Sequence, residues 1–109
     1  MNDLNSISIT GKLVKDGVLT YANPETAILS LDVAVNRSVK RGGEWVSEAS
    51  FLSCSIFGKL AENICNKAKK GSDVAIEGAI RQERWEDKQT GKQKSKLIII
   101  VEKIRVFEK

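Results

Sequence analysis

The sequence contains no histidine, and this absence removes several kinds of catalytic and metal site. Without an imidazole there is no Ser-His-Asp or Cys-His nucleophilic arrangement and no histidine general base. A histidine-ligated zinc site is excluded for the same reason. Carboxylates are plentiful, but no pair of them has a spacing that suggests convergent acid–base chemistry. We therefore predict that the chain is not an enzyme and that it holds no metal or cofactor.

Cysteine, proline and long hydrophobic runs are also scarce. The two cysteines, Cys54 and Cys65, form no CxxC motif, so they are predicted to be small buried hydrophobic residues. The longest apolar run, Leu97 to Val101, is too short to span a bilayer, and the N-terminus shows no signal peptide. One proline and scattered glycines leave no linker. These features predict a single cytoplasmic domain over residues 1–109.

Charge is distributed unevenly along the chain. The net charge is +4, which weakly favours a polyanionic partner. Residues 1–33 hold two lysines and four carboxylates, a balance of −2, so the remaining residues carry +6. The basic residues of this second part form three clusters: Arg37, Lys40 and Arg41; Lys67, Lys69 and Lys70; and Lys88, Lys92, Lys94 and Lys96.

Alternation of apolar and polar residues dominates the first half of the sequence. It predicts a strand over residues 6–14 that bends at Gly11, a turn at 22–25 and a strand over 29–35. Residues 37–48, which contain Gly42-Gly43, form either a basic loop or a long hairpin tip. A third strand over 50–57 follows.

A single helix is predicted after the third strand. Apolar residues recur at helical spacing from Leu60 to Ala68, the lysines of the second cluster lie in its last turn, and Gly71 ends it. The fourth strand starts at Ser72 and runs to Trp85, with Val74, Ile76, Gly78 and Ile80 on one face. A polar turn at Thr90-Gly91 leads to a fifth strand. Its apolar residues 97–101 predict cover on both faces.

Five strands with one helix between the third and the fourth are typical of the OB-fold, a small partly open barrel. The pattern therefore predicts an all-β protein of this class. An unrelated small β-barrel and an open sandwich remain the alternatives.

The third predicted strand carries the main candidate site. Leu52, Cys54 and Ile56 share one face, and the other face holds Phe51 and Phe57 on either side of two serines. Single-stranded nucleic acid offers base faces to flat rings and phosphates to lysine and arginine. The candidate stacking rings are Phe51, Phe57, Trp85 and, from the 37–48 segment, Trp45. Core packing is the alternative role for each ring.

Three stretches of sequence together resemble one known family. They are residues 57–62 (FGKLAE), residues 70–78 (KGSDVAIEG), and Ile80-Arg81 followed by Trp85-Glu86-Asp87 and Thr90-Gly91. In this order and spacing they resemble the bacterial single-stranded DNA-binding proteins, from about Leu4 to Ile104. The resemblance implies an OB-fold that assembles as a homotetramer. It also implies sequence-independent binding of single-stranded DNA during replication, repair and recombination.

The resemblance also suggests residue roles and departures. Stacking positions of the family correspond to Phe51, Phe57 and Trp85, and a further tryptophan position falls near Val39, so that Trp45 is its candidate replacement. A family histidine in the subunit interface corresponds to Leu52, and a family basic position corresponds to Glu83. In the family an acidic tail that recruits replication and repair proteins usually follows the barrel, whereas this sequence stops at Lys109, so we expect either a protein without that tail or one domain of a longer chain.

We therefore expect a nucleoid-associated DNA-binding protein whose four candidate rings stack on bases. Phosphates would follow a set of basic residues, namely Arg37, Lys40, Arg41, Lys59, Lys70, Arg81, Arg84, Lys88, Lys92 and Lys94. The alternative is a primosomal-type OB module that acts mainly through protein partners.

Overall fold

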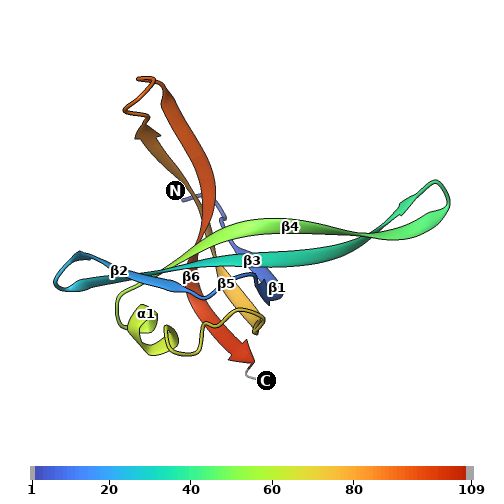
Figure 1. The fold of residues 1–109 in the computed structure, drawn as a ribbon, viewed down its shortest axis with the longest axis horizontal. Helices are drawn as coiled ribbons and strands as arrows, with labels where there is room; N and C mark the ends of the chain where they lie inside the picture. The colour runs from blue at the N-terminus through green and yellow to red at the C-terminus, as the bar shows by residue number, and fades with distance from the viewer. Residues whose placement is uncertain (1, 108–109) are drawn as a thin grey trace.

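The computed structural model describes residues 2–107, which form six strands and one helix (Figure 1). The expected absence of an acidic tail concerns the chain after Phe107, and Glu108 and Lys109 lie outside the described residues. The elements are β1 (Ile7–Leu13), β2 (Val18–Asn23), β3 (Thr26–Arg41), β4 (Glu44–Phe57), α1 (Lys59–Ile64), β5 (Asp73–Glu86) and β6 (Gln93–Phe107). Within this part of the chain, no helix is long and apolar enough to cross a membrane.

Pairing between the strands closes a barrel. β1 pairs with β5 along most of its length and with β3 through Lys12 and Leu13. β5 pairs with β6, β6 runs parallel to β4 at Cys54 and Ser55, and β4 pairs with β3. β2 follows β1 along the same edge of β3, so the two count as one interrupted strand. The predicted five-stranded barrel, with a helix before its fourth strand, is confirmed.

The barrel interior is filled by alternate residues of these strands. The core includes Leu29, Leu31 and Val33 of β3 and Cys54 and Ile56 of β4, all at most 1% exposed. Their spacing of two places them on one face, as the alternation predicts. Burial, with a smaller contribution from the Asp32 charge, raises the pKa of the Cys54 thiol to about 11. Cys54 is therefore a neutral core residue, and Cys65 is half-buried.

The predicted bend at Gly11 coincides with a close approach between two strands. A Cβ atom at Gly11 would lie 2.5 Å from the carbonyl oxygen of Ala34 on β3. Only glycine fits this contact without a shift of the backbone. Gly11 thus lies where β1 passes from its partner β5 to its partner β3.

The segment after β4 differs from its prediction. α1 ends at Ile64, so Lys67, Lys69 and Lys70 follow the helix instead of forming its last turn. After Ile64 the chain makes a tighter turn, in which the Lys67 N–H donates to the Ile64 carbonyl oxygen at 2.8 Å, and the Ala68 carbonyl oxygen then accepts a hydrogen bond from the Gly17 N–H at 2.8 Å. The strand β2 was also not predicted as a separate element, since its residues alternate weakly and most are exposed.

Two apolar residues assigned to covered faces are exposed. Ile80 was predicted to share a face with Val74 and Ile76 but is 43% exposed, although its cross-strand partner Ile99 on β6 is 4% exposed and belongs to the core. Leu97 was predicted to be covered by a helix or by a subunit partner; it is 67% exposed in the single chain, so a subunit partner is the cover that stays a prediction. The side-chain amide of Asn5 lies beside Ile80. Its Oδ1 atom accepts a hydrogen bond from the Ile80 N–H at 2.9 Å, and its Nδ2 atom donates one to the Ile80 carbonyl oxygen at 2.7 Å.

Two long arms project from the barrel in different directions (Figure 1). The β5–β6 arm points to the top of the view, and the β3–β4 arm points to the right. Gly42 and Gly43 connect β3 to β4, both with positive φ (57° and 84°), the combination that a two-residue type I′ hairpin turn requires. Of the two structures predicted for residues 37–48, the hairpin is therefore confirmed.

Candidate nucleic-acid interface

The outer face of β4 exposes two aromatic rings. Phe51 is 69% exposed and Phe57 is 36% exposed, while Ser53 and Ser55 between them are half-buried. The strand period places all four opposite the core residues Cys54 and Ile56. The predicted shallow surface with two projecting rings is thus present in the structure.

A groove with a volume of about 400 Å³ runs across this face. Strand pairing forms it, since Ser53 is opposite Asp32 of β3, Ser55 is opposite Ile100 of β6, and Ile98 is opposite Arg81 of β5. Neighbouring strands therefore bring residues that are distant in sequence to one surface. The charged and aromatic residues lining the groove are Lys15, Asp32, Phe57, Arg81, Glu83 and Lys96.

Arg81 links the aromatic and charged parts of the groove. Its guanidinium carbon lies 5.6 Å from the centroid of the Phe57 ring, within the range of a cation–π contact. Its Nη2 atom lies 3.8 Å from Oε1 of Glu83. The aromatic ring and the cation are therefore adjacent in the groove.

A second ion pair lies on the other side of the groove. The Lys15 Nζ atom is 3.1 Å from Oδ2 of Asp32, and the Ser53 hydroxyl donates to Oδ1 of Asp32 at 3.4 Å. Neither Lys15 nor Asp32 was among the predicted site residues. Lys15 lies in the turn after β1, and its place beside the groove follows from the pairing of β1 with β3.

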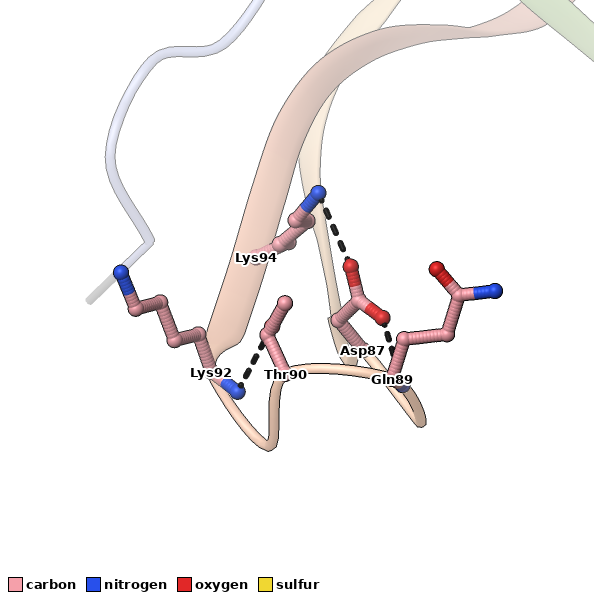
Figure 2. Close-up of polar contacts among 5 residues, drawn as sticks. All are labelled: Asp87, Gln89, Thr90, Lys92 and Lys94. Atoms are coloured by element: carbon pink, nitrogen blue, oxygen red, sulfur yellow. Dashed lines mark hydrogen bonds and ion pairs between the residues drawn. The ribbon is translucent and has the colours of Figure 1, made fainter.

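The tip of the β5–β6 arm is a turn ordered by one carboxylate (Figure 2). Asp87 accepts a hydrogen bond from the Gln89 N–H at 2.9 Å and pairs with the Lys94 Nζ atom at 3.0 Å. The Gln89 N–H, and then Lys94, lower the pKa of Asp87. The Thr90 hydroxyl oxygen accepts the Lys92 N–H at 3.3 Å, while the Lys92 side chain extends away from Asp87.

Each arm carries one exposed tryptophan beside a lysine. Trp85 of β5 is 44% exposed and is the cross-strand partner of Lys94. Trp45 of β4 is 71% exposed and is the partner of Lys40, so it lies in a strand. Trp45 also falls on the same side of β4 as Phe51, which is six residues further along the strand.

The predicted basic residues fall into three groups. Arg81 contacts the groove, and Lys59 begins α1 two residues after Phe57. Most of the others lie on the arms, where Arg41 pairs with Glu48 and the Arg84 guanidinium donates to the Gln82 side chain at 2.6 Å. The arm residues are Arg37, Lys40, Arg41, Arg84, Lys88, Lys92 and Lys94.

Lys70 is the exception. Its backbone N–H donates to Oδ1 of Asp16 at 2.8 Å, in the segment between α1 and β5. This segment lies at the opposite end of the barrel from the tip of the β5–β6 arm (Figure 1). The structure therefore does not bring Lys70 together with the basic residues of that arm.

Two kinds of comparison show what the chain is similar to. Single-stranded DNA-binding proteins of Borreliella burgdorferi and Treponema pallidum are each 36% identical to it over 107 residues. The alignments cover 98% of this chain in both cases, and 72% and 60% of the two relatives. A crystal structure of a deletion mutant of the single-stranded DNA-binding protein from Thermus aquaticus superposes with a TM-score of 0.84 at 24% identity.

That superposition covers 96% of this chain and 51% of the solved one, and it shows a common fold. The chain thus spans about half of the solved structure and about 60% of the Treponema pallidum relative. The model of the Single-strand binding protein family matches residues 4–107, which include both arms, the groove and the whole barrel. The chain belongs to the Single-strand binding protein family.

Proposed function

We propose that this protein binds single-stranded DNA without sequence preference. The observation that carries the proposal is the outer face of β4, where Phe51 and Phe57 are exposed and Phe57 lies against Arg81. Every base has a face that can stack, so such a surface tolerates any sequence. The relatives named single-stranded DNA-binding proteins support the same function.

In the proposed complex, bases stack on Phe57 in the groove, on Phe51 further along the same face of β4, and on Trp45 and Trp85 along the two arms. Phosphates follow the basic residues that flank these rings. The structure supports this path for the groove and the arms, and it gives Lys70 at most a peripheral part. The proposed phosphate contacts are Arg37, Lys40, Arg41, Lys59, Lys70, Arg81, Arg84, Lys88, Lys92 and Lys94.

Titration of the chain with poly(dT) tests the proposal through its tryptophan fluorescence. We expect quenching, because Trp45 and Trp85 are exposed and would stack on bases. The affinity should fall steeply as salt rises, since each neutralised phosphate releases counterions. Absence of quenching, together with equal affinity for duplex DNA, would contradict the proposal.

We propose that the protein binds and protects single-stranded DNA during replication, repair and recombination. It would act in the cytoplasm, at the nucleoid. Catalysis is not part of the proposed function. The names of the relatives support binding. Contacts with replication and repair proteins would be secondary, because the exposed aromatic face of β4 is suited to nucleic acid.

We also propose that the chain acts as a homo-oligomer, with a tetramer as the expected state. Residues 7–11 of β1 pair with β5 on one side, while β3 pairs only with Lys12 and Leu13. A strand edge that is open over this length can pair with a second copy. The adjoining outer face of β1, β5 and β6 also has a hollow of about 480 Å³.

Light scattering with and without oligo(dT) measures this state directly. We expect the mass of four chains in both samples. A monomer at micromolar concentration would contradict the oligomer proposal. A dimer with weak affinity for poly(dT) would instead favour a primosomal-type module that acts through protein partners.

A further inference from the structure

The groove is almost neutral although the chain is basic. Its ionised lining residues are three cations, Lys15, Arg81 and Lys96, and two carboxylates, Asp32 and Glu83, which leaves a balance of +1. Two of the three cations are already paired, Lys15 with Asp32 at 3.1 Å and Arg81 with Glu83 at 3.8 Å. A phosphate that enters the groove must therefore compete with a carboxylate for either cation.

A neutral base meets no such competition. The Phe57 ring offers a stacking surface, and the hydroxyl groups of Ser30, Ser53 and Ser55 can donate to or accept from a base edge. Phosphates brought against Asp32 and Glu83 would instead meet like charge, which opposes binding. The groove thus combines an attractive surface for bases with a repulsive element against phosphates.

We propose that Asp32 and Glu83 are specificity-determining residues that reserve the groove for unpaired bases and exclude the phosphates of duplex DNA. This inference rests on the proposed function. A duplex keeps its bases stacked inside and presents a dense row of phosphates, so it gains nothing from Phe57. Discrimination between two ligands often depends on such a repulsive element against the wrong one.

The test compares Asp32→Asn, Glu83→Gln and the double variant with the native chain. Fluorescence anisotropy would measure the affinity of each for labelled oligo(dT) and for a duplex of equal length, in one buffer. Asp73→Asn is the matched control, because Asp73 forms an ion pair with Lys12 at 3.0 Å that lies outside the groove. It changes the net charge by the same amount as each single substitution.

We expect each groove substitution to raise duplex affinity about threefold and the double variant to raise it about tenfold, beyond the effect of the control. Oligo(dT) affinity should rise by no more than about twofold beyond the control, so the preference for single strands falls about fivefold in the double variant. All three substituted carboxylates have partly exposed side chains, and thermal melting would verify that each of the four variants is folded.

Two results would overturn the inference while leaving the proposed function in place. One is duplex affinity no higher than that of Asp73→Asn. The other is an equal rise for duplex and oligo(dT), which would mean that the carboxylates weaken binding without selecting a ligand. Failure of the native chain to bind oligo(dT) would instead overturn the proposed function, and the inference with it.

Discussion

Replacing both Phe57 and Trp85 by alanine is expected to weaken binding of oligo(dT) by about a hundredfold to a thousandfold. Each stacked base contributes about 1–3 kcal/mol, so the loss of two rings removes a large part of the binding free energy. Both rings are partly exposed, and Phe57 lies over Arg81. Fluorescence anisotropy with labelled oligo(dT) measures the loss, since it does not depend on the removed tryptophan.

The chain offers a closely matched control in Phe107. This ring is also exposed, and the Arg105 guanidinium carbon lies 5.6 Å from its centroid, the same separation as between Arg81 and Phe57. Phe107 is at the far end of β6, away from the groove, so Phe107→Ala should leave the affinity within about twofold of native. If Phe107→Ala lost as much affinity as the double variant at Phe57 and Trp85, the groove would not be the binding face.

Single substitutions on the β5–β6 arm separate stacking from charge. Trp85 and Lys94 are cross-strand partners, so both would meet the same part of a bound strand. We expect Trp85→Ala to cost more affinity than Lys94→Ala or any other single lysine substitution. Lys94→Ala should mainly reduce the dependence on salt. Equal losses would indicate that charge alone holds the strand.

Replacing Leu31 by alanine is expected to destabilise the barrel by about 2–5 kcal/mol. Leu31 is 1% exposed and lies in the core on β3, between Leu29 and Val33. A domain of ordinary stability unfolds at a cost of about 5–15 kcal/mol, so this single change removes a substantial fraction. Urea unfolding followed by circular dichroism, at one fixed protein concentration, gives the change in free energy.

Leu97 is the matched control for this experiment. It is the same residue type in a strand, but it is 67% exposed on the β5–β6 arm. Leu97→Ala should change the free energy of unfolding by no more than about 0.5 kcal/mol. A loss as large as that of Leu31→Ala would mean that the exposed face of β6 is covered in solution, for example in an oligomer.

Local pattern predicted much of the fold because alternation and turn chemistry are local properties. Because side chains alternate along a strand, the sequence places Cys54 and Ile56 on one face and Phe57 on the other, and the structure confirms this placement. The helix end was wrong because apolar spacing continues to Ala68, whereas the Lys67 N–H already turns back to the Ile64 carbonyl oxygen at 2.8 Å. β2 was missed because its pairing with β3, more than its composition, makes it a strand.

The site was predictable only in part. The sequence selects Phe51 and Phe57 as rings on one face of a strand, and both are exposed in the structure. Parity grouped Ile80 with Val74 and Ile76, but parity alone does not show how far the rest of the molecule covers a strand face, and Ile80 is 43% exposed. Lys15 and Asp32 carried no local signal, since their part in the groove depends on which strands are neighbours.

By itself, the sequence determined the absence of histidine chemistry, the alternation that builds a small barrel and the motifs that mark the family. Tertiary structure alone decided that Phe57 of β4 meets Arg81 of β5, because β6 lies between these strands and joins them in one sheet. It also decided that Lys15, in the segment after β1, forms an ion pair with Asp32 of β3. These contacts depend on which strands pair with one another, and the alternation of residues along the sequence does not specify the order of strands in the sheet.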